Sequence, residues 1–291
     1  MRGKVAFIVV MLTFGSIGLF VTHIDLASSQ IALFRGAIGS VFLIGASFFV
    51  KQTLNLKISK RNLLMLVLSG AALGFNWIFL FEAYQYTTIS NATLSYYFTP
   101  VFVMVLAPFI LKEKWTGKKG LSIVIALIGL FLVVQPDAGL DGGDYLHTVG
   151  IGYGLLAAGF YASVILINKF INGLSDFETT VMQLSIASIV LLPYVWLTEG
   201  MNVSGLDMQS LILLAILGVI HTGVAYILYF SAIKQLKGQT IGVLSYIDPI
   251  SAVFMAAIIL SESMSWIQVV GGICILGSTF LSEMKVDEEH A

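Results

Sequence analysis

Ten long apolar segments follow one another along the chain, with short polar stretches between them. Each segment runs for about 20 residues and is apolar on every side, whereas a half-buried strand would alternate apolar and polar residues. A helix of about 20 residues is long enough to cross the hydrocarbon core of a bilayer. The pattern therefore predicts ten transmembrane helices, at residues 4–22, 28–50, 62–85, 89–112, 117–135, 148–168, 177–198, 210–234, 239–260 and 266–285.

The composition requires lipid as the main solvent of this surface. Hydrophobic residues make up 58% of the 291 residues and charged residues 11%, whereas soluble domains average about a quarter of charged residues. In lipid every backbone polar group must be bonded within the protein, which leaves helices or closed barrels, and barrel strands would alternate over about ten residues. We therefore predict an all-α membrane protein that has the lipid bilayer as a partner. The net charge of -1 gives no indication of nucleic-acid binding.

Basic residues are confined to alternate connections between the predicted helices, apart from one arginine inside the second helix. Connections rich in Lys and Arg face the cytoplasm by the positive-inside rule. We therefore predict a multi-pass protein of the plasma membrane with both termini in the cytoplasm, and a first helix that is retained rather than cleaved as a signal peptide. The basic residues are Arg2, Lys4, Lys51, Lys57, Lys60, Arg61, Lys112, Lys114, Lys118, Lys119, Lys169, Lys234, Lys237 and Lys285, and the opposite connections hold Asp25, Asp137, Asp141, Asp144, Glu199, Asp207 and Glu262.

The two halves of the chain resemble each other when Phe81 is placed on Phe230 and the sequences run forward without gaps. Five helices per half is an odd number, so the second half enters the membrane from the opposite side, as in the inverted repeats of many secondary transporters. We therefore predict two inverted five-helix repeats, 1–137 and 147–285, followed by a short cytoplasmic tail, 286–291. The most specific matches are Tyr97 with Tyr246, Pro100 with Pro249, and Glu113 with Glu262.

Two motifs carry a resemblance to a known family over essentially the whole chain. Phe81-Glu82-Ala83 is matched by Phe230-Ser231-Ala232 near the end of the third helix of each half, and each mid-helix proline is followed after that helix by a glutamate. In this the sequence resembles the EamA family of the drug/metabolite transporter superfamily. The resemblance implies a ten-helix bundle around a central cavity that carries amino acids, related metabolites or xenobiotics, often as an exporter. It does not settle the substrate, because members of one fold differ in specificity.

Three ionisable residues, Arg35, His221 and Asp248, fall inside predicted helices, where a charge costs about 3 kcal/mol. Arg35 shares a helix face with Gly36 and Gly39, and small residues let helices approach closely, so it is expected to face the bundle interior. It is a candidate to hold a substrate carboxylate or to pair with a gating acid. The alternatives are a structural clamp on backbone carbonyls and a side chain that snorkels to the membrane surface.

Asp248 and His221 are the candidates for proton coupling. Asp248 precedes Pro249, and the first half has Thr99 before Pro100, so the acid belongs to one half only. A carboxyl group away from water is a possible proton carrier, although a static partner of Arg35 or His221 is the other interpretation. His221 titrates near neutrality in water, but a lone histidine among apolar residues is more often a satisfied core residue. Pro100 and Pro249 are expected to kink their helices, because proline lacks an N–H and clashes with the preceding turn.

A second group of candidates consists of neutral polar and aromatic residues at mid-membrane depth. A tyrosine hydroxyl at that depth needs a partner, which favours a cavity or a bond between helices. Each residue alone is more typical of packing, but together they indicate a polar and aromatic cavity suited to amino acids or to aromatic and cationic organic molecules. These substrate-binding candidates are Asn76, Trp77, Tyr96, Tyr97, Tyr161, Gln183, Tyr226 and Tyr246.

The leading hypothesis is a secondary transporter that moves a small polar or amphipathic metabolite by alternating access, as an exporter, with protons as a possible coupling ion. The alternatives are an intramembrane enzyme, which would need a nucleophile facing His221, and a membrane sensor or assembly protein. There is no phosphate-binding loop for ATP, and we expect no cofactor, metal or catalytic residue. Cys274 is the single cysteine, so it forms no intramolecular disulfide. The chain is expected to be a monomer or a weak homo-oligomer.

Overall fold

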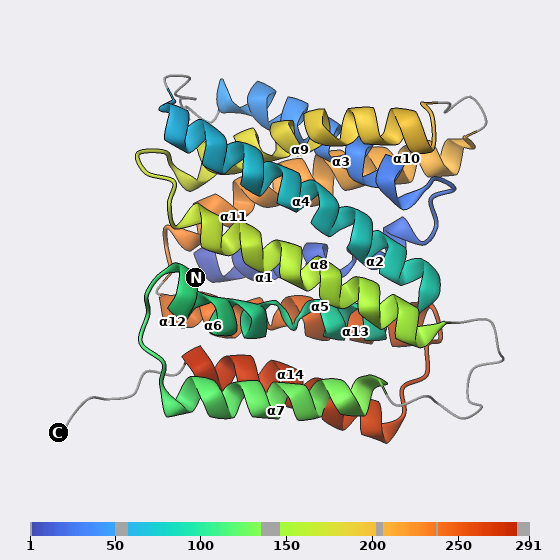
Figure 1. Cartoon of the computed structure of the whole chain (residues 1–291). Helices are drawn as coiled ribbons and strands as arrows, with labels where there is room; N and C mark the ends of the chain where they lie inside the picture. The colour runs from blue at the N-terminus through green and yellow to red at the C-terminus, as the bar shows by residue number, and fades with distance from the viewer. Residues whose placement is uncertain (1, 50–57, 135–145, 202–205, 237, 284–291) are drawn as a thin grey trace.

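The structure is a computed structural model that describes residues 2–49, 58–134, 146–201, 206–236 and 238–283, and this part of the chain is helical with no strand. Figure 1 shows the helices lying side by side as one bundle. Some spans are single helices and others are interrupted. In chain order the elements are α1 (Arg2–Gly15), α2 (Ile17–Val21), α3 (Ser28–Ser47), α4 (Lys60–Tyr86), α5 (Ile89–Tyr96), α6 (Thr99–Ile110), α7 (Gly117–Val134), α8 (His147–Asn168), α9 (Asp176–Thr198), α10 (Met208–Ile216), the π-helix η1 (Leu217–Val224), α11 (Ala225–Ile233), α12 (Gly238–Ser245), α13 (Ile247–Ile259) and α14 (Trp266–Glu283).

Each of the ten predicted helices corresponds to one helix or to one interrupted span. Nine of these spans in the described residues are long and apolar enough to cross a membrane, and the tenth is the shorter apolar stretch Trp266–Leu281. The prediction of an all-α, ten-helix membrane protein is therefore confirmed. Several predicted loop charges and the predicted tail lie outside the described residues, namely Lys51, Lys57, Asp137, Asp141, Asp144, Lys237, Lys285 and residues 286–291.

Side-chain caps fix where several helices begin. Ser59 accepts from the N–H of Asn62 at the start of α4, and Thr88 does the same for Asn91 at the start of α5. The first N–H groups of a helix have no partner within it, so a capping oxygen stabilises the end by about 1 kcal/mol. Single residues of the short loops are therefore enough to cap the helices that follow them.

The fourth and ninth spans are interrupted just before their prolines. Pro100 lies in the first turn of α6 and Pro249 in the first turn of α13. The proline ring clashes with the carbonyl four residues earlier, which is where α5 and α12 end, and the hydroxyl of Thr99 donates to the Tyr96 carbonyl at 2.8 Å. The predicted kinks are thus complete breaks, with helix ends inside the bundle.

The element pattern of the first half recurs 149 residues later, which is the offset from Phe81 to Phe230. Both ends of α5 and of α7 reappear at this offset as the ends of α12 and α14. Lys112 and Ser261, also 149 positions apart, have φ angles of 56° and 55°. A positive φ is uncommon for residues other than glycine, so the same unusual turn follows the same helix in both halves.

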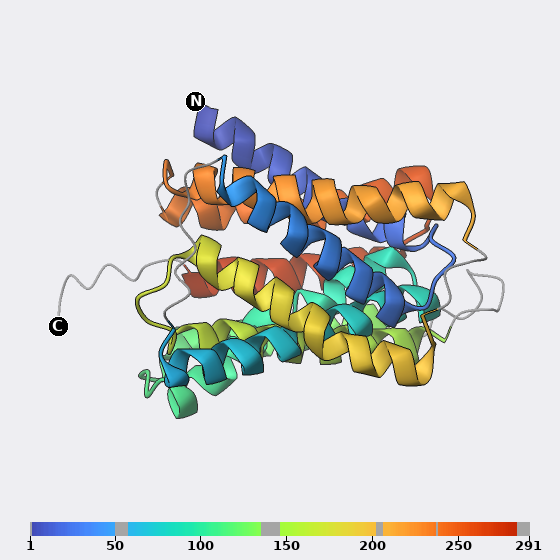
Figure 2. The same cartoon turned by 90° about the horizontal axis from the view of Figure 1, so that it is seen from above.

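Helix contacts are also equivalent in the two halves: when each span is replaced by its counterpart in the other half, the same pairs of spans are in contact. The first span packs against the eighth and ninth spans, through α11 and α13, and the sixth span packs in the same way against the third and fourth, through α4, α5 and α6. The second span packs on the seventh and the fifth on the tenth. Figure 1 shows α7 beside α14, and Figures 1 and 2 show α3 beside α9. We call the side that holds the start of α1 the terminus side and the opposite side the far side.

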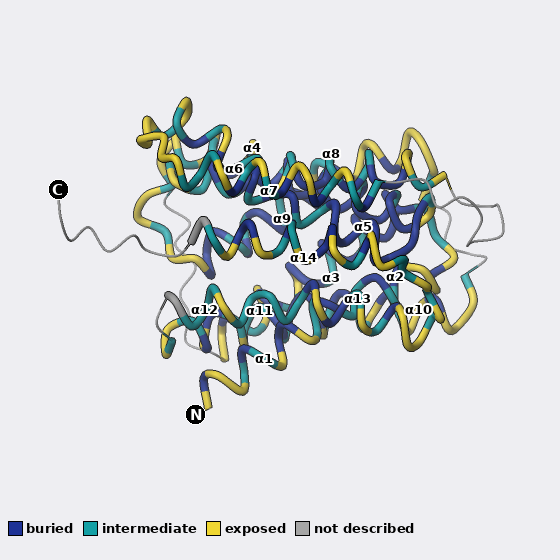
Figure 3. Tube along the Cα trace, turned by 90° about the horizontal axis from the view of Figure 1, so that it is seen from below, coloured by how far each residue is buried: buried dark blue, intermediate teal, exposed yellow. Residues whose placement is uncertain are grey.

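The outward surface of the bundle is apolar. Figure 3 shows exposed stretches on the outer faces of the helices and buried stretches between them. Large side chains on the outer faces include Phe109, Phe131, Leu197 and Trp266, whereas Phe81 and Leu184 are fully buried. A contiguous apolar exterior of this extent is typical of a surface covered by lipid.

Candidate functional site

The centre of the bundle holds a buried guanidinium group. Arg35, on α3, is 4% exposed, and its Nε donates to the hydroxyl of Thr222 on η1 at 3.0 Å. Its Cζ atom lies 4.7 Å from the ring centroid of Trp77 and 5.8 Å from that of Phe81, both on α4. Arg35 therefore faces the bundle interior as predicted, and it does not snorkel to a membrane surface.

The guanidinium keeps most of its donors unused. Within the described residues, only the Nε–H of its five N–H donors has a hydrogen-bond acceptor, and no carboxylate lies within 4.0 Å of it. A charge away from water is costly unless it is paired. The planar fork of arginine matches a carboxylate or another planar oxyanion in a bidentate manner. The free Nη groups of Arg35 are thus a candidate site for an anionic group.

A π-helix places Thr222 beside this arginine. In η1 the Thr222 hydroxyl donates to the carbonyl of Leu217, five residues earlier, at 2.9 Å, so the same oxygen is left to accept from Arg35. π-helices in α-helical surroundings are rare and occur often at functional sites. The matching stretch of the first half is uninterrupted α-helix within α4, so this feature belongs to one half only.

Glycines bring α3 close to its neighbours at this level. A Cβ atom on Gly39 would lie 2.8 Å from Cβ of Thr222, and one on Gly36 would lie 3.2 Å from Cζ3 of Trp77. Larger residues at these positions would push the neighbouring helices away. The small-residue face of α3 that the sequence shows is therefore what allows Arg35 to reach η1 and α4.

A second polar pair joins the two halves. The hydroxyl of Tyr97, at the end of α5, donates to Oδ2 of Asp248 in the first turn of α13 at 2.6 Å. Tyr96 packs beside Tyr97 and also against Tyr161 of α8, with ring centroids 5.9 and 5.8 Å apart. The N–H groups at the start of α13 favour a negative charge at Asp248. In the structure Asp248 is paired with a tyrosine, and its partner is neither Arg35 nor His221.

These two sets of residues adjoin each other. Tyr96 and Tyr226 pack on the same buried cluster as Trp77 and Phe81, the two rings that face Arg35, and Tyr96 contacts Tyr97, the partner of Asp248. Nδ2 of Asn76 donates to the carbonyl of Ala157 at 2.7 Å, which ties α4 to α8 beside them. The structure therefore brings together eight residues, which we call the central group: Arg35, Trp77, Tyr96, Tyr97, Tyr161, Thr222, Tyr226 and Asp248.

His221 lies next to the central group but is fully engaged in packing. Its Nε2 is 2.9 Å from the hydroxyl of Ser16 and its Nδ1 is 3.4 Å from the Ile216 carbonyl. Its ring packs edge-to-face with Phe20, with ring centroids 4.6 Å apart. It joins the eighth span to the break between α1 and α2. This arrangement favours the interpretation of His221 as a satisfied core residue over that of a proton carrier.

Two sequence candidates contact residues outside the central group. Gln183 donates to the hydroxyl of Ser69 at 2.7 Å and to Oδ1 of Asn168 at 2.6 Å, in a cluster between α4, α8 and α9. Tyr246 packs on Phe280 of α14, with ring centroids 6.1 Å apart. Both residues connect helices at these positions.

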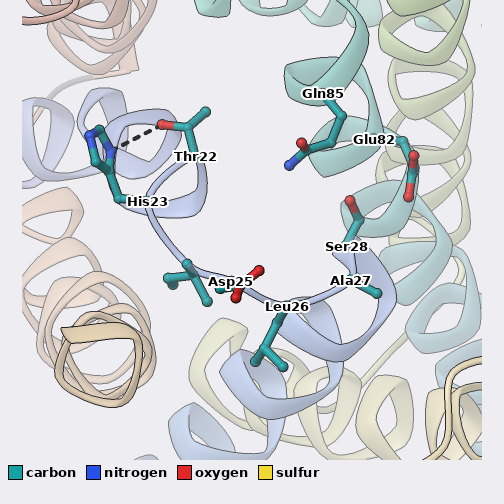
Figure 4. Close-up of a pocket in the computed structure, with 9 residues that line it drawn as sticks. Thr22, His23, Asp25, Leu26, Ala27, Ser28, Glu82 and Gln85 are labelled. Carbon is teal, nitrogen blue, oxygen red and sulfur yellow. Dashed lines mark hydrogen bonds between the residues drawn. The ribbon is translucent and has the colours of Figure 1, made fainter. Parts of the chain in front are cut away.

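A pocket of about 500 Å³ opens at the far side of the bundle. Figure 4 shows Glu82 and Gln85 of α4 on one side of it and, on the other, the segment from Thr22 to Ser28 with Asp25 in its middle. None of the residues that line this pocket belongs to the central group. It is a separate polar recess near the ends of the first three spans.

Sequence reasoning did not single out Thr222 as a member of the site. A threonine is a common residue in transmembrane helices, and its neighbour His221 gives the stronger chemical signal. The structure assigns the reverse roles, because the π-helix turns Thr222 toward Arg35 and His221 toward Ser16. No local pattern predicts a π-helix, so the signal was absent from the sequence.

A helical bundle of two similar halves, with a polar group where the halves meet inside the membrane, is the architecture of membrane transporters. A sequence model of the EamA-like transporter family matches residues 1–135 and 148–284. The chain therefore belongs to the EamA-like transporter family, and the resemblance seen in the motifs is confirmed.

Similar proteins carry the names of transporters. An uncharacterized transporter of Bacillus subtilis, YxxF, is 30% identical over 96% of this chain and 88% of its own length. A probable amino-acid metabolite efflux pump of Salmonella typhimurium is 24% identical over 81% of this chain and 80% of its own length. A solved crystal structure shares the fold with a TM-score of 0.63 at 16% identity, over 97% of this chain and 96% of that one. The protein is thus a multi-pass membrane transporter.

Proposed function

We propose that this protein is a secondary transporter that exports a small metabolite bearing a carboxylate, such as an amino acid or a related compound, by alternating access between its two halves. The observation that carries the proposal is Arg35, a buried guanidinium with one bonded donor and no carboxylate partner in the described residues. A substrate carboxylate would supply the missing acceptors. The aromatic residues around it suit the apolar part of an amphipathic substrate.

The division of the chain supports alternating access. We propose that residues 1–137 and 147–285 are inverted repeats, since elements recur at a constant offset and pack in exchanged pairs. We further propose that the terminus side faces the cytoplasm, because the basic connections gather there, and that the membrane is the plasma membrane. Export is the direction suggested by the efflux pump among the relatives.

Proton coupling is assigned to Asp248 in this proposal. Its carboxylate belongs to the second half and accepts from Tyr97 of the first half at 2.6 Å. Protonation would weaken this bond between the halves, since a charged acceptor binds a donor more strongly than a neutral one. A proton taken up on one side would therefore favour the separation that the transport cycle needs.

The experiment is a binding and transport screen of the detergent-purified protein. A bound metabolite stabilises the folded protein by mass action, so carboxylate metabolites are compared in thermal shift with matched amines that lack the carboxylate. Compounds that raise the melting temperature are then followed across proteoliposome membranes with and without a pH gradient. We expect carboxylates to stabilise and to move. Stabilisation by the amines alone, or no movement of any compound, would contradict the proposal.

A further inference from the structure

A carboxylate from the second half caps a helix of the first half at the far side. Oε1 of Glu262, which follows α13, accepts from the N–H of Ile89 at 2.7 Å. Oε2 accepts from the N–H of Ser90 at 3.1 Å and from the Ser90 hydroxyl at 2.8 Å. With Thr88 bonded to the third N–H, the whole first turn of α5 is satisfied, and two of these backbone bonds depend on the other half of the protein. A negative charge at a helix start is also favoured by the helix dipole.

The helix that receives this cap is more deeply buried than its counterpart in the other half. Seven of the eight residues of α5 are buried, whereas in α12 none of the side chains that the structure describes is buried. Leu94 of α5 is 2% exposed, and its counterpart Val243, 149 positions later, is 54% exposed. At the far side α5 is therefore buried among its neighbours, whereas at the terminus side α12 is more exposed.

The counterpart of the capping glutamate is disengaged. Glu113 lies 149 positions before Glu262, and the matching target is the start of α12 at Gly238. In the structure Glu113 instead pairs with Lys119 of its own half at 2.9 Å, with its side chain 47% exposed. The two glutamates thus occupy equivalent positions in opposite states, one bonded across the halves and one bonded within its own half.

We propose that Glu262 and Glu113 are alternating latches, of which Glu262 holds the far side shut while the protein is open toward the terminus side. When the halves exchange conformations, Glu262 leaves α5 and Glu113 caps the first turn of α12, which closes the terminus side. This inference rests on the alternating access proposed above. It adds the residues that decide which side is closed, and these residues lie outside the central group.

The test measures opening of the far side with a buried reporter. Cys274, the single cysteine, is replaced by serine, and Thr93→Cys places a thiol on α5 at a position that is 5% exposed. A membrane-impermeant maleimide applied from the far side labels this thiol only when the far side opens. The labelling rate then follows the population of the open state.

The latch predicts opposite effects for the two glutamates. Glu262→Gln should raise the labelling rate roughly tenfold or more, the factor expected when one hydrogen bond to a charged acceptor is lost. Glu113→Gln should lower it, because it weakens the state in which the far side is open. Glu82→Gln is the matched control, since it removes a carboxylate from the far-side pocket rather than from α5, and it should leave the rate unchanged.

Ser90→Ala keeps the proposal testable if Glu262→Gln does not fold. It removes the hydroxyl bond at 2.8 Å and keeps both backbone bonds, so a smaller rise in the same direction is expected. An unchanged labelling rate in both variants, in protein that still moves a solute, would overturn the latch and leave the transport function standing. A thiol that is never labelled in any variant, together with no solute movement, would overturn alternating access and the latch with it.

Discussion

Replacing Arg35 by glutamine separates its two possible roles. Arg35 makes one hydrogen bond, to Thr222, and lies over two aromatic rings at 4.7 and 5.8 Å. The hydrogen bond contributes about 1.5–3 kcal/mol and a desolvated cation–π contact about 2 kcal/mol. Burying an uncompensated guanidinium costs several kcal/mol. The opposing contributions are of similar size, so Arg35→Gln should change the free energy of unfolding by no more than about 2 kcal/mol.

Substrate binding should respond much more strongly. A carboxylate held by the two free Nη groups of Arg35 would form two charge-assisted hydrogen bonds. Their loss costs at least about 3 kcal/mol of binding free energy, which raises the dissociation constant roughly 100-fold or more. Arg35→Lys keeps the positive charge but loses the planar guanidinium group that can bind a carboxylate through two parallel hydrogen bonds. We therefore expect an intermediate loss of substrate affinity, of about tenfold.

Calorimetric titration of the purified variants with a carboxylate from the screen measures the binding change, and thermal melting measures stability. Binding that falls while the melting temperature stays nearly constant is the expected result. A large drop in melting temperature with unchanged affinity would refute the anion-binding role and show that Arg35 is a structural clamp. The contrast is sharp because one residue is expected to affect two measurements by very different amounts.

Three further changes follow from named contacts. Thr222→Val removes the hydroxyl that accepts from Arg35, so it should weaken the binding free energy of the substrate by about 1–3 kcal/mol. An unchanged affinity in calorimetric titration would show that Thr222 does not contribute to the site. Asp248→Asn should abolish the dependence of flux on a pH gradient while substrate still binds, and retained gradient dependence in proteoliposomes would remove the aspartate from coupling. Asp207 caps α10 outside the membrane span, and hydrogen bonds from the hydroxyl and N–H of Ser210 lower its pKa from the usual value. The cap by Asp207 therefore stabilises the fold above the usual pKa of an aspartate, and this stabilisation is lost as the pH falls through the lowered pKa. Melting temperatures recorded at decreasing pH should show this loss, and Asp207→Asn should remove it.

Much of the fold follows from local sequence properties. Hydropathy alone places the ten spans, because each apolar segment must satisfy its own backbone in lipid and so becomes a helix. The breaks at Pro100 and Pro249 follow from the missing N–H and the ring clash. The small-residue face of α3 also indicates correctly that Arg35 faces the interior. Each of these depends on residues that are close together in the chain.

The membership of the site was harder to predict because it depends on rotation about the helix axis. A helix that is apolar all round gives little periodic signal for which face meets which neighbour. Gln183 and Tyr246 lie at suitable depths, and in the structure they contact Asn168 and Phe280. Thr222 joins the site because η1 is wound as a π-helix.

The sequence by itself determined the number of spans, the positions of the two proline interruptions and the 149-residue offset between the halves, because hydrophobic length and proline chemistry are local properties. It did not determine which of the two equivalent glutamates bonds across the halves. Two similar halves can exchange conformations with little difference in local energy, so the choice depends on contacts between residues far apart in the chain. Only the tertiary structure shows Glu262 bonded to the start of α5 while Glu113 pairs with Lys119. The same holds for the proposed anion site, because only the arrangement of helices from both halves leaves Arg35 without a carboxylate partner among the described residues.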